Sequence, residues 1–198
     1  MTPNIMTDLL AYNCNLNTPG LAAPDLASSF SRSFMHELAR EGDLLSAEVL
    51  VEAGYALDLP NDEGRRPLHE AAFFGHLPMV RFFVENGALV DAPIQPLGLT
   101  ALYLAVQQSR YDVVTYLLRC GASFDVEDML MGTGLLHVAA AKDDMQMAGM
   151  LVSAGINAFH EDKKGLTARD TAAKCGHRTL ANALLKVMEH HAKFALKG

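Results

Sequence analysis

Apolar residues recur at helical spacing along this chain of 198 residues, in four stretches that are each followed by a glycine. In one of them, Val80, Phe83 and Val84 are three or four residues apart, which places them on the same face of a helix. The equivalent residues of the other stretches are Val49 and Leu50, then Val113, Val114, Leu117 and Leu118, then Met147, Leu151 and Val152. Each stretch therefore predicts an amphipathic helix whose apolar stripe needs a neighbour to cover it.

The glycines that follow these stretches are almost evenly spaced. Gly54, Gly87, Gly121 and Gly155 are separated by 33, 34 and 34 residues. Two further series keep the same interval: the pairs Met35-His36, Leu68-His69, Leu102-Tyr103 and Leu136-His137, and the glycines Gly64, Gly98, Gly132 and Gly165. Because a sequence period of about 20 to 50 residues is typical of stacked repeats, the chain is predicted to be an array of similar units.

One unit carries a recognisable signature. It starts at Gly64, reads Gly-Arg-Arg-Pro-Leu-His-Glu-Ala-Ala-Phe-Phe-Gly-His and closes at Gly87. This unit resembles an ankyrin repeat, whose signature is Thr-Pro-Leu-His-x-Ala. Further copies start at Gly98, Gly132 and Gly165, and a degenerate copy covers residues 34–58. The resemblance extends over about residues 31–192 and implies a small, stand-alone ankyrin-repeat protein with about five repeats.

The resemblance implies an all-α fold, a solenoid of stacked helix–turn–helix units with projecting β-hairpin-like fingers. Pro67 suits the first turn of an inner helix, and Gly75 suits a left-handed turn into an outer helix over residues 77–85. Ser109 and Asp143 replace this glycine in the next two units. Those turns are therefore expected to be slightly strained or reshaped.

The predicted repeats cover residues 31–60, 61–93, 94–127, 128–160 and 161–198. In the last repeat no glycine follows Leu184 and Leu185, so the second helix is expected to continue to about Lys193 and to cap the array. Residues 1–30 are interpreted as a half-repeat cap followed by a long loop. Disorder of this segment is the alternative.

The composition narrows the classes of partner. A net charge of −7 and a pI near 5.5 oppose binding to nucleic acid, because phosphate neutralisation needs clustered Lys and Arg. No apolar run reaches the roughly 18 residues that a membrane span needs, and residues 1–8 do not resemble a secretory signal. Cys14, Cys120 and Cys175 are expected to be free thiols in a reducing compartment. A cytoplasmic protein is therefore expected, with signal-independent export left open.

Recognisable catalytic motifs are absent from the sequence, which has no phosphate-binding loop and no nucleophile-elbow, dinucleotide or zinc-protease motif. In ankyrin repeats the histidine found here as His36, His69 and His137 helps to knit the turn before the inner helix. One histidine per repeat cannot supply the ligands that zinc requires. We therefore expect no catalytic residue, no metal and no cofactor. An enzyme with an unrecognised site is kept as an alternative class.

Partners of ankyrin folds usually dock on the groove lined by the inner helices and on the fingertips. Carried over by position, the groove contains Phe73, Phe74, Gln107, Gln108 and Lys142. Two adjacent aromatic residues are notable here, since aromatic side chains supply much of the binding energy at protein interfaces.

The two longer fingers carry large apolar residues at their tips. These are Ile94 and Leu97 in one finger, and Met129, Leu130 and Met131 in the next. They are expected to form one exposed apolar patch beside the two phenylalanines, and an exposed patch of this kind usually marks an interaction site. The alternative is that the tips fold back onto each other and bury these groups.

The sequence thus predicts a non-enzymatic protein–protein interaction module that acts as an adaptor or an inhibitor. Its expected partner is another protein, and it is expected to be a monomer or a weak oligomer. A homo-oligomeric assembly protein is the alternative function.

Overall fold

The computed structural model describes residues 34–195, and almost all of their regular structure is helical. The helices are formed by residues 34–41 and by α3 (Leu44–Glu52), α4 (Pro67–Phe74), α5 (Leu77–Glu85), α6 (Ala101–Gln107), α7 (Tyr111–Arg119), α8 (Leu135–Ala141), α9 (Met145–Ser153), α10 (Ala168–Lys174) and α11 (Arg178–Ala195). Two short strands, β1 (Glu127–Asp128) and β2 (Thr133–Gly134), pair antiparallel. The cap and loop expected over residues 1–30 lie outside the described residues, as does Cys14.

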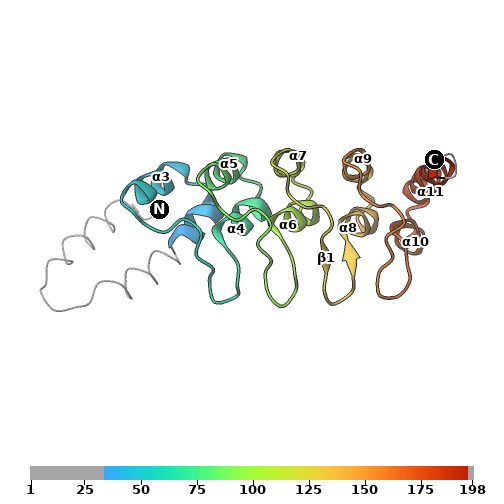
Figure 1. Cartoon of the computed structure of the whole chain (residues 1–198), viewed down its shortest axis with the longest axis horizontal. Helices are drawn as coiled ribbons and strands as arrows, with labels where there is room; N and C mark the ends of the chain where they lie inside the picture. The colour runs from blue at the N-terminus through green and yellow to red at the C-terminus, as the bar shows by residue number, and fades with distance from the viewer. Residues whose placement is uncertain (1–33, 196–198) are drawn as a thin grey trace, which may run out of the picture.

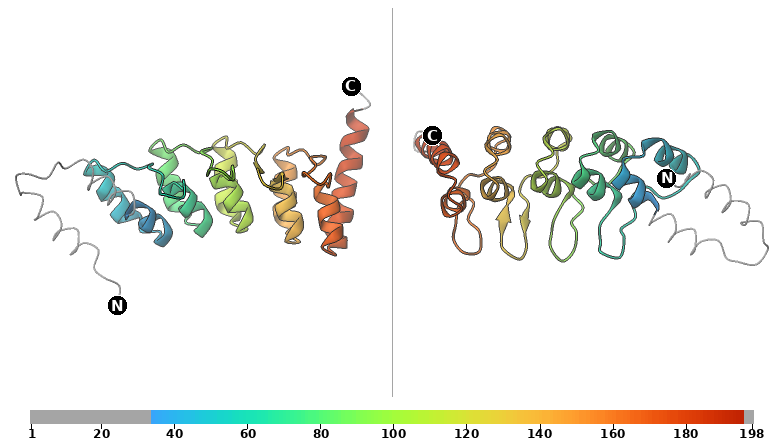
Figure 2. Two further views of the ribbon diagram at one scale, coloured as in Figure 1. Left: turned by 90° about the horizontal axis from the view of Figure 1, so that it is seen from below. Right: turned by 180° about the vertical axis from the view of Figure 1, so that it is seen from behind.

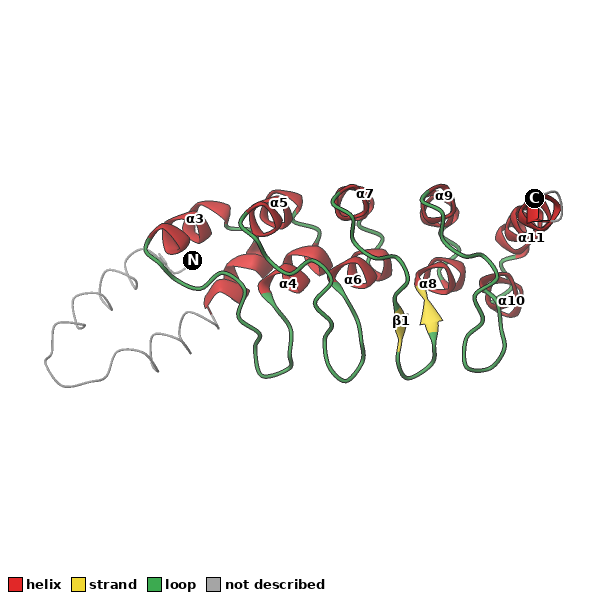
Figure 3. Cartoon of the chain, viewed as in Figure 1, coloured by secondary structure: helices red, strands yellow, loops and turns green. Residues whose placement is uncertain are grey.

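The helices lie in two rows, and each helix pair follows the previous one along a single direction (Figure 1). One row contains α4, α6, α8 and α10, which we call the inner helices; the other contains α3, α5, α7, α9 and α11, the outer helices. The loops between pairs project as fingers on the side of the inner helices (Figure 3), and Figure 2 shows the same succession from below and from behind. The predicted all-α solenoid with projecting fingers is confirmed, whereas the limits of the individual repeats stay predictions.

Apolar side chains fill the space between successive pairs. Phe83 on α5, Leu117 on α7 and Leu151 on α9 are completely buried. On the inner helices the buried positions include small residues such as Ala72 and Ala140, which let neighbouring helices approach closely. Removing apolar surface from water contributes about 25 cal/mol per Å², so stacking is a main source of stability.

One residue of the predicted apolar stripe lies elsewhere. Val49 is 40% exposed, whereas Ala47 and Leu50 of the same helix are buried. Successive residues of a helix are separated by about 100°, so the face that buries Leu50 turns Val49 towards solvent.

The turns between inner and outer helices have the predicted left-handed backbone. Gly75 has φ 85°, and a Cβ atom there would come within 2.6 Å of the Arg110 side chain of the next unit. Ser109 and Asp143 take the same conformation, with φ 53° and 56°. The Ser109 hydroxyl donates a hydrogen bond of 2.8 Å to Asp144, which compensates part of the strain in that turn.

The repeated histidines join each unit to the finger that follows it. Nε2 of His36, His69 and His137 lies 2.9, 2.9 and 2.8 Å from the backbone oxygens of Arg65, Ala92 and Leu166. A carbonyl oxygen can only accept, so each Nε2 carries the proton and donates. His69 also accepts from the N–H of Arg66 at Nδ1, and this contact matches the role expected in its own turn. The structural role therefore includes a link between units that the sequence did not predict.

A second series of bonds ends on the last carbonyl groups of the helix over residues 34–41 and of the inner helices α4, α6 and α8. His76, Arg110, Lys142 and His177 reach the backbone oxygens of Arg40, Phe73, Gln107 and Ala141 over 2.8, 3.1, 2.6 and 3.2 Å. Carbonyl groups at a helix C-terminus have no partner within the helix. Each unit therefore completes the hydrogen bonding of the one before it.

We expect Leu117→Ala to lower the free energy of unfolding by about 2 to 5 kcal/mol, because the substitution leaves a cavity at a completely buried position. Urea denaturation followed by circular dichroism measures the change. Leu45→Ala is the matched control, since Leu45 is 67% exposed, and it should change stability by less than about 0.5 kcal/mol. Equal effects of the two substitutions would contradict the burial of Leu117 between the repeats.

A second prediction concerns the stability of the protein at low pH. Burial lowers the pKa of His69 from 6.5 to about 4, so the unfolded chain binds a proton at this residue before the folded chain does. The contribution of neutral His69 to the free energy of unfolding is therefore complete above pH 6.5. It falls by about 3 kcal/mol in total as the pH drops from 6.5 to about 4. His69→Gln keeps an N–H donor for Ala92 but does not titrate, so its stability should depend less on pH by this amount.

Unfolding free energies measured between pH 7 and pH 4 test this prediction. His191→Gln serves as the control, because it removes a histidine that is exposed on α11 rather than one that is buried. Parallel curves for the wild type and His69→Gln would show that His69 does not titrate in the expected range.

Candidate functional site

A groove crosses the inner helices α6, α8 and α10. It has a volume of about 490 Å³, and the residues that matter for its chemistry are Gln107, Gln108, Thr133, Val138, Lys142 and Thr171. Three of them, Gln107, Gln108 and Lys142, were predicted, and the structure brings them together. Thr133, Val138 and Thr171 were missed, although Val138 lies one helical turn before the predicted Lys142 and Thr171 is its equivalent on α10. The groove has an apolar floor and a rim of amides, hydroxyls and one ammonium group.

Lys142 holds a positive charge at a fixed place in this groove. Its Nζ donates to the backbone oxygen of Gln107 over 2.6 Å and to Oγ of Ser109 over 3.2 Å. Both acceptors belong to the preceding unit, so the side chain bridges α8 and the end of α6. An ammonium group has three donors, which leaves one for an acceptor on a bound molecule.

The two predicted phenylalanines form a cluster with two arginines. The rings of Phe73 and Phe74 meet edge to face, with centroids 5.2 Å apart. The Arg65 guanidinium carbon lies 5.8 Å from the centre of the Phe73 ring, and that of Arg40 lies 5.7 Å from the centre of Phe74. Phe74 is 36% exposed. Aromatic and arginine side chains are the types most enriched among residues that dominate binding energy.

The most exposed apolar group of the predicted set is the tip of the finger between β1 and β2. Met129, Leu130 and Met131 are 54%, 64% and 50% exposed, and we call these three residues the apolar tip. Within the finger, Asp128 accepts hydrogen bonds from the N–H groups of Leu130 and Gly132. The turn is therefore closed by its own hydrogen bonds.

The neighbouring fingers hold the apolar tip on both sides. The N–H of Met129 donates to the backbone oxygen of Leu97 over 3.0 Å, and the N–H of Lys163 donates to that of Met131 over 2.9 Å. The ammonium group of Lys163 also reaches the backbone oxygen of Met129. The expected neighbourhood of the fingertips is thus present, and it fixes the backbone while the apolar side chains stay in solvent.

The finger between α5 and α6 differs from the prediction. Ile94 is only 5% exposed and Leu97 is half-buried, so Ile94 cannot belong to an exposed patch. The reason is local: the N–H of Ile94 donates to the oxygen of Leu99, and the N–H of Gly98 donates to the oxygen of Ile94, both over 2.8 Å. These bonds close the finger and turn Ile94 inward. The prediction of one exposed apolar patch that includes Ile94 is therefore wrong. Ile94 is buried, as in the alternative.

Three other features bear on function: metal ligands, membrane-spanning helices and free thiols. Within residues 34–195, no three His, Cys, Asp or Glu side chains gather closely enough to hold a metal ion. None of the helices in this part of the chain combines the length and apolar character that crossing a bilayer requires. Cys120 and Cys175 are exposed free thiols.

Ser109, His137 and Asp143 have the residue types of a hydrolytic relay, but each is engaged elsewhere. The Ser109 hydroxyl donates to Asp144, and Nε2 of His137 donates to the oxygen of Leu166. Asp143 lies 3.7 Å from Nδ1 of His177 and not beside His137. These three side chains are therefore not arranged as nucleophile, base and orienting acid.

Comparison with known proteins agrees with the resemblance to ankyrin repeats. Residues 35–128 match the family model "Ankyrin repeats (3 copies)". Among curated proteins, the chain is 31% identical to the nuclear factor NF-kappa-B p105 subunit of Mus musculus, over 69% of this chain and 14% of that protein. It is 28% identical to the putative palmitoyltransferase ZDHHC13 of Danio rerio, over 94% of this chain and 28% of that protein.

A third relative is the probable 26S proteasome regulatory subunit p28 of Saccharomyces cerevisiae. It is 31% identical over 70% of this chain and 60% of its own length. The chain thus spans less than two-thirds of each of these relatives.

Proposed function

Because the chain belongs to the ankyrin-repeat family, whose members generally use their repeats for protein–protein interaction, we propose that it is a non-enzymatic module that binds one partner protein. It acts by occupying a surface of that partner, as an inhibitor, or by linking it to a second protein, as an adaptor. Exposed thiols at Cys120 and Cys175 suit a reducing compartment, so we place the module in the cytoplasm.

The apolar tip is the observation that carries this proposal. Three large apolar side chains are at least half exposed on a turn that hydrogen bonds hold from both sides. Apolar surface in water is unfavourable, and methionine adapts its shape to irregular surfaces. A rigid tip also loses little conformational entropy on binding. These properties favour a docking site over an accidental exposure.

The groove would orient the partner once the apolar tip has engaged it. Lys142 offers a donor to a carboxylate or a backbone oxygen, and the amides of Gln107 and Gln108 offer both donors and acceptors. Phe74 adds an exposed aromatic face two units away along the array. A partner segment that lies across α8, α6 and α4 would reach all of these groups.

A triple substitution tests the proposal: Met129→Ser, Leu130→Ser and Met131→Ser. The partner is first identified by affinity purification and mass spectrometry with the wild-type chain, and binding of the purified partner is then measured by biolayer interferometry. We expect affinity to fall at least about tenfold, because residues that anchor an interface each contribute about 2 kcal/mol or more. Circular dichroism should show an unchanged fold, since the tip contributes little to the buried core.

The matched control carries Leu45→Ser, Leu89→Ser and Met145→Ser, three apolar residues that are 67%, 59% and 42% exposed elsewhere on the array. It should bind as the wild type does. Unchanged binding by the tip variant, or equal loss in both variants, would refute the proposed surface. Light scattering separates the homo-oligomer alternative, because a wild-type oligomer that becomes monomeric in the tip variant would show that the tip binds a second copy.

A further inference from the structure

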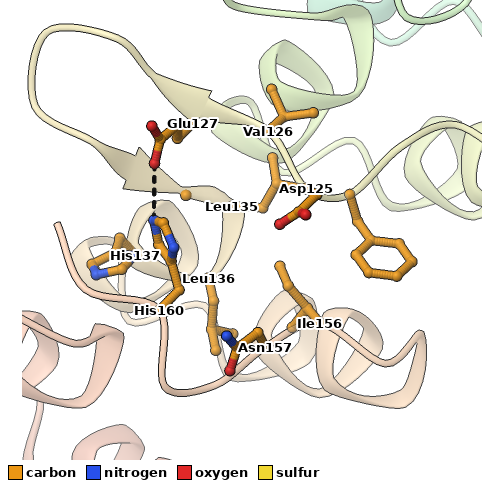
Figure 4. Close-up of a pocket in the computed structure, with 11 residues that line it drawn as sticks. Asp125, Val126, Glu127, Leu135, Leu136, His137, Ile156, Asn157 and His160 are labelled. Carbon is orange, nitrogen blue, oxygen red and sulfur yellow. Dashed lines mark ion pairs between the residues drawn. The ribbon is translucent and has the colours of Figure 1, made fainter.

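A second cavity lies beside the finger that contains β1 and β2, between β1, the start of α8 and the loop that follows α9 (Figure 4). Its volume is about 280 Å³. Of the residues that line the groove, only His137 also lines this cavity. The cavity is therefore a separate feature, and a ligand held in it does not depend on the function proposed for the groove and the apolar tip.

The chain itself provides a comparison for Asp125, which points into the cavity in Figure 4. Asp58, Asp91 and Asp125 occupy the same place in three successive units, 33 and 34 residues apart. The first two accept hydrogen bonds from the next unit, from the N–H of Leu89 over 3.1 Å and of Ser123 over 3.0 Å. The carboxylate of Asp125 has no hydrogen-bond or ion-pair partner among residues 34–195. It is the one member of this series that is left available to another molecule within the described part of the chain.

The same comparison can be made for Phe124, which precedes Asp125 in the chain. Leu57 and Val90 occupy equivalent positions in the first two units, and both pack against the core. The next unit has Phe124 at that position, which is 37% exposed, and the unit after it has Ala158, which is buried. The ring of Phe124 therefore lines the cavity and is partly exposed, whereas its counterparts in the two earlier units pack against the core.

A carboxylate replaces a proline in the wall. Where the two earlier units have Pro60 and Pro93, the next unit has Glu127. Nε2 of His160 lies 3.2 Å from the Glu127 carboxylate and 3.0 Å from the backbone oxygen of Gly132. This pair fixes the Glu127 carboxylate on the cavity wall, as the dashed line in Figure 4 shows.

His137 gives the wall a further negative potential. Its Nε2 donates to the oxygen of Leu166, and Nδ1 is buried and receives no hydrogen bond from the described residues. Burial lowers the pKa of His137, so the ring stays neutral and Nδ1 carries a lone pair. Because Nδ1 is buried, it acts on a bound cation through its electric field and not through contact.

The lining defines the chemistry of a ligand. Asp125 and Glu127 are anionic and Asn157 offers an amide oxygen, which disfavours anions and favours a cationic donor. Leu135 and Ile156 form an apolar floor that suits a hydrocarbon stem. The volume is at the lower limit of sites for whole small molecules, which begin at about 300 Å³, and it suits one long side chain.

We propose that this cavity binds the side chain of an arginine from another protein. A guanidinium group is planar, stays charged and has five N–H donors in a fork that matches a carboxylate, so Asp125 can accept two bonds from it. Its apolar stem lies over Leu135 and Ile156, and its flat face can stack on the ring of Phe124. A lysine would offer a point charge without the fork or the stacking face.

The test uses a small probe, N-acetyl-L-argininamide, titrated into the ¹⁵N-labelled chain and followed by ¹H–¹⁵N correlation spectra. The matched probe is N-acetyl-L-citrullinamide, which has the same shape and no charge. We expect saturable shifts of the amide signals of Asp125, Glu127 and Asn157 with the arginine probe only. Asp125→Asn should weaken binding about tenfold or more, because it removes a charge-assisted hydrogen bond. Asp112→Asn, an equal change at an exposed carboxylate on α7, should not.

Three results would overturn the proposal: equal shifts with both probes, no saturable shift at the solubility limit of the arginine probe, or equal affinity for the corresponding lysine probe. Well-dispersed spectra of both variants show that each is folded, so loss of binding cannot be confused with unfolding. Partner binding by the apolar tip is measured separately, and failure of one experiment leaves the other unaffected.

Discussion

The contact between one helix pair and the next determines every other property of this molecule, because a single pair cannot bury its own apolar side chains. Phe83, Leu117 and Leu151 are completely buried on three successive outer helices. Apolar contact has no direction, however, and would let neighbouring units slide. Hydrogen bonds remove this freedom: His69 ties its unit to Ala92 of the following finger, and the donors of each unit reach the carbonyl groups that end the preceding inner helix. Burial supplies the stability, and these bonds supply the register.

The fixed register has a direct consequence for the fingers. Units that cannot slide place their fingers side by side, so each finger becomes a hydrogen-bonding partner of the next. The backbone of the apolar tip is held by Leu97 on one side and by Lys163 on the other. A turn with large apolar side chains can therefore stay exposed without collapsing onto its own unit. The hydrogen bonds between neighbouring fingers therefore also hold the exposed apolar tip in place.

The sequence predicted those features that follow from a local rule repeated in each unit. Pro67, Gly75 and the alanines of the inner helices act within one turn, so the helix pairs and the left-handed turn at Gly75 were predictable. The absence of a glycine after Leu185 likewise predicted that α11 continues to about Lys193. The burial of Ile94 was not, because bonds across its finger decide it and neither partner differs from an ordinary loop residue. The sequence also did not predict that the Asp125 carboxylate has no hydrogen-bond partner among the described residues. The equivalent carboxylates, Asp58 and Asp91, both accept a hydrogen bond from the next unit. Such properties depend on the neighbour's geometry and not on the residue itself.

The fourth unit departs from the repeated rules more than the others do. The N-cap of α8 is Gly134, which has no side chain to cap the helix, and Asp143 takes a left-handed conformation that costs an ordinary residue about 1 kcal/mol or more. Asp144 accepts hydrogen bonds where His76 and Arg110 donate them, and Lys142 supplies the missing donor. An isolated domain would lose much of its stability through such changes, whereas an array tolerates them because both neighbours still bury the unit. Locally unfavourable choices tend to be retained where they serve a site. The groove, the apolar tip and the proposed arginine cavity all draw residues from this unit, so its departures from the repeated rules coincide with the surfaces proposed for binding.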